Sequence, residues 1–173
     1  RKTVQGSVAP ANLKLMEETI RSRTQQVLDD LPVGEQFDWV DKVSIELTTQ
    51  MLATLFDFPF EDRRKLTRWS DVATGDEESG IVESEEARQA ELYECLEYFT
   101  RLWHEREENG ERNDLVSMLA NGEATKDMSP QEYLGNLILL IVGGNDTTRN
   151  SMTGGVWALN QNPGEYALSL IHI

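Results

Sequence analysis

The residues best suited to take part in a reaction form one polar segment that directly follows an apolar run. Residues 143–148 read Gly-Gly-Asn-Asp-Thr-Thr, and residues 137–142 before them are all aliphatic. Two adjacent glycines leave bare backbone, which a small molecule can approach closely. A carboxylate and a hydroxyl beside that backbone, from Asp146 and Thr147, could pass protons to the molecule bound there.

A single long helix is predicted to carry this segment. Its start has Ser129 as the N-cap, with Pro130 and Glu132 at the first and third helical positions. Nothing in the pattern clearly stops the helix before Asn162. Residues 130–161 are therefore expected to form one rod, roughly 48 Å long.

The middle of this helix is expected to be weak. Each glycine costs about 1 kcal/mol relative to alanine in a helix interior. The Thr147 hydroxyl can bond the Gly143 carbonyl one turn earlier, which would open the helical ladder and bend it. Because residues 137–142 are apolar all round, other helices are expected to enclose the groove. The alternative is a purely structural kink, in which Asp146 pairs with Arg149.

Helical periodicity also runs through most of the remaining chain. We expect helices between Pro10 and Pro32, from Asp38 to before Pro59, and around residues 66–72, 92–103 and 114–120. Residues 74–86 are rich in acids and small polar residues, which favours a surface connection. No segment alternates convincingly, so the chain is predicted to be mainly α, without a β-sheet.

Composition narrows the possible functions. There are 31 acidic and 16 basic residues, and the formal charge of −15 argues against nucleic acid as a partner. The longest apolar run has six residues, far fewer than the roughly 20 that a membrane span needs. The single cysteine, Cys95, excludes an internal disulfide and a cysteine-rich zinc site. A zinc-binding helix is not expected either, because Glu108 stands where His104 would need a second histidine.

Residues 143–148 resemble the oxygen-activation motif of cytochromes P-450, which is Ala/Gly-Gly-x-Asp/Glu-Thr-Thr/Ser, at all six positions. The wider run LGNLILLIVGGNDTTRNSM and the opening RKTVQGSVAPANLKLME resemble bacterial P-450s that hydroxylate the terminal carbon of medium-chain alkanes and related acyl chains. The resemblance extends from Arg1 to about Tyr166. It implies that residues 1–166 are the distal-side helical portion of one P-450 domain, truncated at both ends.

The resemblance implies roles for four residues of the motif. Gly143 and Gly144 would line the groove in which dioxygen sits at the haem. Asp146 and Thr147 would pass protons to it through water. These two side chains are therefore the predicted catalytic residues.

The same resemblance places three residues around the cofactor and the substrate. Leu139 and Val142 would border the substrate, although both could be plain core residues. Arg1 would pair with a haem propionate, although an exposed terminal residue is an equal alternative. Residues 74–86 would connect two helices that cover the substrate channel.

The resemblance implies a haem-thiolate monooxygenase that inserts one atom of O2 into a terminal C–H bond of a medium-chain alkane, alcohol or fatty acid. Haem b would be the cofactor. Electrons would come from NADH through a ferredoxin reductase and a ferredoxin, in the bacterial cytoplasm. The family holds its haem iron by a cysteine in a glycine-rich loop, and Cys95 lacks that context, so the fragment should be inactive alone.

Two further interpretations complete the sequence-based predictions. Residues 167–173 carry no charged Lys, Arg, Asp or Glu, where the family continues with a charged helix. We therefore expect this tail to be foreign or frameshifted sequence. The alternative function is an acidic helical binding module without a cofactor, whose pair of glycines forms a structural kink.

Overall fold

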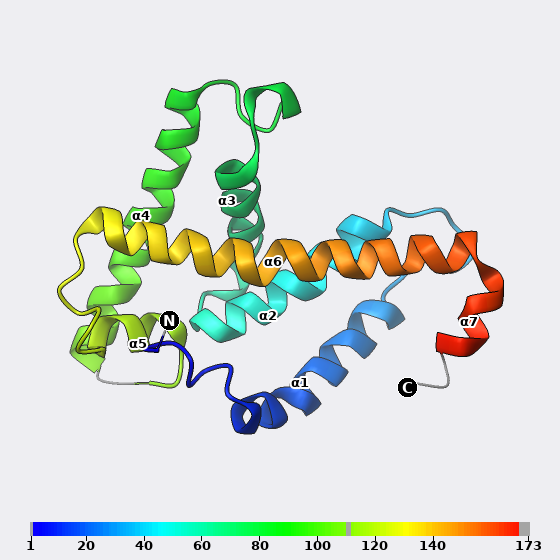
Figure 1. The fold of residues 1–173 in the computed structure, drawn as a ribbon, viewed down its shortest axis with the longest axis horizontal. Coiled ribbons are helices and arrows are strands. Elements are labelled where there is room, and N and C mark those ends of the chain that lie inside the picture. The colour runs from blue at the N-terminus through cyan, green and yellow to red at the C-terminus, as the bar shows by residue number, and fades with distance from the viewer. Residues whose placement is uncertain (1, 110–111, 170–173) are drawn as a thin grey trace.

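The computed structural model describes residues 2–109 and 112–169 (Figure 1). The prediction for Arg1 therefore lies outside the described residues, as do the last four residues of the tail. The elements in chain order are α1 (Pro10–Asp29), the π-helix η1 (Val40–Ile45), α2 (Glu46–Phe56), the short 3-10 helix η2 (Phe60–Asp62), α3 (Arg64–Thr74), the 3-10 helix η3 (Glu77–Ser79), α4 (Glu85–Asn109), α5 (Leu115–Asn121), α6 (Pro130–Gln161) and α7 (Pro163–Ser169).

The helix α6 crosses the whole molecule, and α2, α3, α4 and η1 pack against it. In Figure 1, α4 crosses α6 near its N-terminal end, α3 rises above α6, and α1 lies below it, with α2 alongside α6. The described residues include no strand, which confirms the prediction of a mainly α chain. None of their helices has the length and apolar character that crossing a bilayer requires.

Local signals in the sequence explain where α6 begins and how α2 ends. The Glu132 amide donates to the Ser129 hydroxyl, and the Ser129 amide donates to the Glu132 carboxylate at 2.8 Å. This reciprocal cap is the one predicted from the sequence. At the C-terminal end of α2, Asp57 adopts a left-handed conformation with φ of 48° and so ends the helix.

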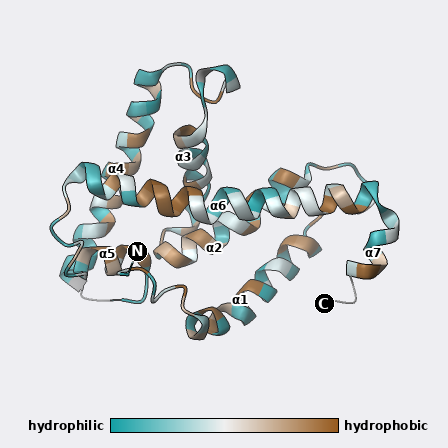
Figure 2. Ribbon diagram, in the orientation of Figure 1, coloured by the Kyte–Doolittle hydropathy of each residue, from teal (hydrophilic) through white to brown (hydrophobic). Residues whose placement is uncertain are grey.

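An aromatic cluster between α2, α3 and α4 forms the base of the core. Phe56 and Phe99 meet edge to face with ring centroids 5.3 Å apart, and Trp69 lies 6.0 Å from Phe99. From α6, Leu137 and Ile141 are fully buried against this cluster. Figure 2 shows hydrophobic residues gathered in the N-terminal half of α6, where it crosses α3 and α4. The core therefore holds one stripe of α6 in a fixed position.

Several element predictions need correction. The segment Val40–Ile45 forms a π-helix rather than the start of a regular α-helix. The helix α4 continues through the charged stretch to Asn109, although the sequence suggested an earlier end. Beyond α6, the chain forms another helix, α7, whose last residues include positions 167–169 of the tail.

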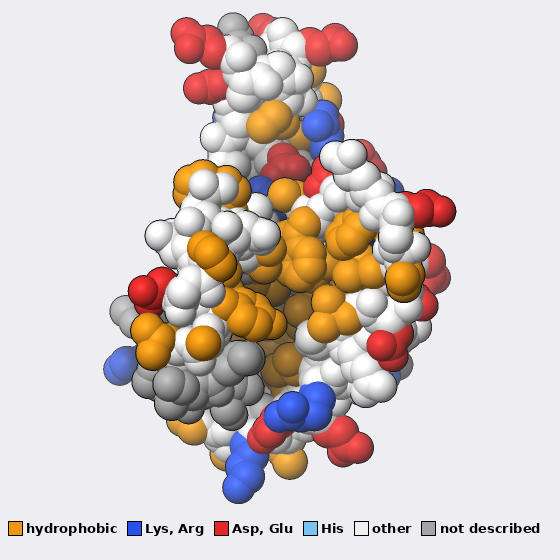
Figure 3. Space-filling model, turned by 90° about the vertical axis from the view of Figure 1, so that its right-hand side faces the viewer, with side chains coloured by type: hydrophobic (Ala, Val, Ile, Leu, Met, Phe, Trp, Pro, Cys, Tyr) orange, Lys and Arg blue, Asp and Glu red, His pale blue; other side chains and the backbone are white. Residues whose placement is uncertain are grey.

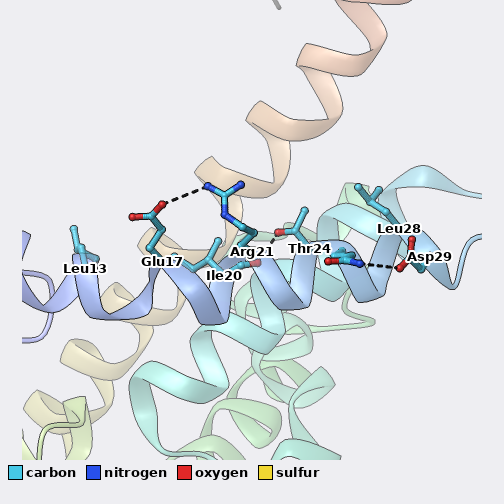
Figure 4. Close-up of a pocket in the computed structure, with 8 residues that line it drawn as sticks. Leu13, Glu17, Ile20, Arg21, Thr24, Leu28 and Asp29 are labelled. Carbon is cyan, nitrogen blue, oxygen red and sulfur yellow. Dashed lines mark hydrogen bonds and ion pairs between the residues drawn. The ribbon is translucent and has the colours of Figure 1, made fainter. Parts of the chain in front are cut away.

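One side of the molecule presents an apolar hollow between α1, α2 and α6. Met16, Met51 and Met152 line it together with leucines of the same helices, and Figure 3 shows hydrophobic side chains around it. The outer side of α1 continues this surface with Leu13 and Ile20, beside polar residues that include the ion pair between Glu17 and Arg21 (Figure 4). The described residues do not cover this surface.

Candidate functional site

The polar motif at residues 143–148 lies within α6, which is one uninterrupted α-helix in the described structure. The Thr147 hydroxyl donates to the Gly143 carbonyl oxygen at 3.1 Å, as predicted. The prediction that this bond opens the helical ladder is wrong. A carbonyl oxygen has two lone pairs, so it can accept the hydroxyl in addition to the helical N–H. The motif is therefore presented by a regular helix.

The two glycines face different surroundings. A Cβ atom at Gly143 would have no other atom within 4 Å, whereas one at Gly144 would lie 2.7 Å from Cδ2 of Leu52. Gly144 thus lets α6 approach α2 closely, because a side chain there would collide with a buried leucine. Both glycines are exposed among the described residues: Gly143 borders open space, and Gly144 lines the apolar hollow between α1, α2 and α6.

The open face of α6 contains three of the positions singled out from the sequence. Leu139 is 70% exposed, and Gly143 and Thr147 follow at intervals of four residues, both of them exposed. Val142 beside them is half-buried. The prediction that other helices enclose this run is wrong for this face among the described residues. Among the described residues, Leu139 is not part of the core.

Asp146 turns away from this open face toward α3. Its Oδ1 accepts hydrogen bonds from the Ser70 hydroxyl and from Nη2 of Arg149, each at 3.0 Å. Arg149 also donates to Oδ1 of Asp71 at 2.9 Å. The ion pair of Asp146 with Arg149 is confirmed. The carboxylate is half-buried and anchored to α3, whereas the Thr147 hydroxyl bonds along its own helix.

Asn145 and Ser70 are the residues of this region that the sequence analysis did not single out as functional. Asn145 is fully buried, and its Oδ1 accepts a hydrogen bond from the Thr48 hydroxyl at 2.9 Å. The signal for its burial was present, because it continues the four-residue spacing of Leu137 and Ile141. No local pattern identified Ser70, which lies 76 positions from Asp146 in the sequence.

The open face of α6 fits the distal side of a haem site. Leu139 offers apolar surface, Gly143 offers bare backbone, and Thr147 offers a hydroxyl, which together can receive a flat apolar macrocycle and a small molecule above it. Cys95 is fully buried in α4, and burial raises the pKa of its thiol, so it stays a neutral core side chain.

The chain is similar to several known monooxygenases, although no family model matches it. It is 32% identical over 169 residues to steroid C26-monooxygenase of Mycolicibacterium smegmatis, covering 97% of this chain and 39% of that protein. It is 30% identical over 167 residues to linalool 8-monooxygenase of Pseudomonas putida, covering 96% of this chain and 41% of that protein. The chain spans about two fifths of the length of these curated relatives.

Solved structures show the same relationship. Cytochrome P450-153 from Novosphingobium aromaticivorans is 51% identical and superposes with a TM-score of 0.83, over 96% of this chain and 40% of that one. The superposition includes α6 and the helices that pack on it, because so little of the chain is left out. Sequence identity and superposition lead to the same conclusion: the chain belongs to the cytochrome P450 family.

Proposed function

We propose that the complete protein is a haem-thiolate monooxygenase and that residues 1–166 form its distal side. The observation that supports this most directly is the open face of α6. Leu139, Gly143 and Thr147 are uncovered on a helix whose opposite stripe, at Leu137 and Ile141, is fully buried. A helix that is packed on one side and apolar but open on the other is suited to line a cofactor and its substrate.

Some residues of the motif would leave room for the cofactor, and others would supply protons. When bound, the haem supplies the chemistry that cleaves O2 and oxidises the substrate C–H bond. Gly143 leaves room at the helix surface, and Thr147 holds a hydroxyl proton at the same place. Asp146 would exchange protons with water and supply them through water to this hydroxyl, while Ser70 and Arg149 hold its carboxylate toward α3. In this proposal, Arg1 pairs with a haem propionate.

We propose an apolar substrate of medium chain length, namely an alkane, an alcohol or a fatty acid, oxidised at its terminal carbon. Leu139 and Val142 provide an apolar wall, and each CH2 group buried there is worth about 0.8 kcal/mol. Two relatives are named for a reaction at one numbered carbon of an apolar molecule, a steroid and linalool. Electrons come from NADH through a ferredoxin reductase and a ferredoxin in the bacterial cytoplasm.

The test uses the complete protein, loaded with haem and supplied with NADH, a ferredoxin reductase and a ferredoxin. With n-octane as substrate, we expect 1-octanol and a thiolate-type spectrum of the reduced protein with carbon monoxide. Residues 1–173 alone should give no such spectrum, because Cys95 is buried. A complete protein that binds no haem would overturn the proposal and support the cofactor-free binding module instead.

A further inference from the structure

The buried amide of Asn145 is an unfavourable feature of α6 if stability alone is considered. Its side chain is fully buried, and its Nδ2 has no hydrogen-bond partner in the described part of the chain. A buried polar group with an unmade hydrogen bond destabilises the folded state. An apolar residue would continue the stripe of Leu137 and Ile141 without this penalty. The amide therefore calls for an explanation other than packing.

The oxygen of the Asn145 side chain does have a partner, on the neighbouring helical segment formed by η1 and α2. The Thr48 hydroxyl is 2.9 Å from Oδ1 of Asn145 and also 2.9 Å from the Ser44 carbonyl oxygen. Two turns further along α6, the hydroxyl of Thr153 lies 2.9 Å from that of Ser44. Polar contacts thus join α6 to the η1–α2 segment at two positions, Asn145 and Thr153.

Between these positions and the core, Gly144 fixes the distance between the helices. Its backbone approaches Leu52 so closely that a Cβ atom would lie 2.7 Å from Cδ2. Apolar contacts alone allow a helix to slide or rotate by small amounts at little cost. A directional hydrogen bond at a buried position restricts that freedom, as a buried asparagine does in a coiled coil. Here it adds to the contacts of Asp146 with Ser70 and of Arg149 with Asp71, which join α6 to α3.

The position of Asn145 in the motif gives this bond a consequence for the site. Asp146 and Thr147 follow it directly, so any rotation of α6 about its axis turns both side chains by the same angle. We propose that the Thr48–Asn145 hydrogen bond is a positioning device that fixes the rotation of α6 and thereby holds Asp146 and Thr147 in their working orientations. This inference rests on the proposed monooxygenase function.

The experiment compares Thr48→Val, Asn145→Leu and the double variant in the complete haem-loaded enzyme. Each single variant leaves one polar group buried without its partner, so the midpoint of thermal unfolding should fall. The double variant has an apolar pair, and its midpoint should return to that of the unsubstituted enzyme. Its yield of product per NADH should nevertheless fall by about tenfold, because a small misplacement of reacting groups is costly. Thr48→Ser, which keeps the hydroxyl, should retain the yield.

A second measurement does not depend on activity. Hydrogen exchange at the amides of residues 143–149 should become about tenfold faster in the double variant, because the local structure opens more readily. Ser44→Ala is the matched control: it removes the polar contact with Thr153 but leaves Asn145 and Thr48 in place. We expect it to preserve both the product yield and the exchange rates at residues 143–149.

Three outcomes would overturn the inference. One is a double variant with the product yield and exchange rates of the unsubstituted enzyme. Another is a double variant whose midpoint stays as low as those of the single variants, since the pair would then be structural. The third is a Ser44→Ala enzyme that loses as much product yield as Thr48→Val. If the unsubstituted enzyme itself makes no product, the proposed function fails, and the exchange measurement still tests whether the pair positions α6.

Discussion

At the scale of single residues, the two adjacent glycines of α6 have separate reasons to be glycine. Gly143 meets open space, and Gly144 meets the buried side chain of Leu52. The sequence suggested one groove lined by both glycines. In the structure both glycines are exposed, but only Gly144 lies beside another helix, where it lines the apolar hollow next to Leu52. The same substitution at the two positions should therefore have different effects.

Alanine substitutions test this division. Gly143→Ala should raise the free energy of unfolding of the haem-free protein by about 1 kcal/mol, because alanine has the higher helix propensity and meets no atom of the described residues. Gly144→Ala should give less stabilisation than Gly143→Ala or none, because the end of the Leu52 side chain must move to make room for the new methyl group. Chemical denaturation measures both values. Equal effects of the two substitutions would contradict the assignment.

Asp146 can be tested with a substitution that preserves its geometry. Asp146→Asn keeps an oxygen that can accept from Ser70 and Arg149, but the amide cannot exchange a proton as a carboxylate does. We expect turnover of the complete enzyme to fall by about 10²-fold and to acquire a solvent deuterium isotope effect. Turnover at the normal rate without that isotope effect would remove Asp146 from the proton pathway.

The chemistry of the motif was predictable from sequence, because its residues are neighbours along one helix. The bond from Thr147 to Gly143 and the pair between Asp146 and Arg149 both follow from helical spacing. The contacts of the motif with other helices were not predictable. Ser70 and Thr48 lie 76 and 97 positions away from their partners, and no local pattern encodes such pairs.

At the scale of elements, the bounds of α6 were easy to predict from the sequence. Which of its faces other helices cover was hard to predict. The cap at Ser129 and Glu132 is local, so its sequence signal was sufficient. The exposure of Leu139 depends on which other segments pack there, and apolar character alone does not determine that. The π-helix at Val40–Ile45 was missed for a related reason: it lies against α6, and residue types alone do not distinguish it from an α-helix.

A charged cluster joins the beginning of α2 to the beginning of α3 and should make stability depend on pH. Burial raises the pKa of Glu46, but hydrogen bonds from Gln50 and Arg63 and the charges of Arg63 and Arg64 outweigh it, so the pKa lies below its usual value of 4.5. The Oε1 atom of Glu46 accepts a hydrogen bond from Nη2 of Arg63 at 2.8 Å. The ionised form is therefore the one that the fold favours.

The sign of the pH effect follows from the lowered pKa. Stability from Glu46 is fully present above the pKa of the unfolded chain and is lost as the pH falls through the folded pKa. Unfolding of the complete protein, measured between about pH 7 and about pH 3, should show this acid loss. Glu46→Gln should lower stability at neutral pH and make the acid limb shallower. An acid limb of unchanged steepness would contradict the role of Glu46.

At the scale of the whole molecule, the part of the chain that the structure describes leaves an apolar surface uncovered. The hollow between α1, α2 and α6 continues onto the outer face of α1, where Leu13 and Ile20 are exposed. Such patches on a protein favour association with other apolar surfaces. The chain produced alone should therefore bind a hydrophobic dye and self-associate, as dye fluorescence and sedimentation can show.

Substitutions on and off this surface provide the control. Replacing Leu13 and Ile20 by glutamate should reduce dye binding and association, because charges are placed in the apolar surface. Val33 is also apolar and is 97% exposed, but it does not line the hollow. Val33→Glu should therefore have little effect. A monomer that binds no dye would show that the uncovered surface has no influence on association.

The role of the open face of α6 depends most directly on Thr147, whose hydroxyl lies beside the bare backbone of Gly143. The decisive measurement is the amount of product and of hydrogen peroxide formed per NADH by the complete enzyme carrying Thr147→Ala, with Thr147→Ser as the control that keeps the hydroxyl. We expect the alanine variant to keep consuming NADH while peroxide replaces product, and the serine variant to remain coupled. An alanine variant that converts NADH to product as efficiently as the unsubstituted enzyme would contradict the assignment of this face to oxygen chemistry.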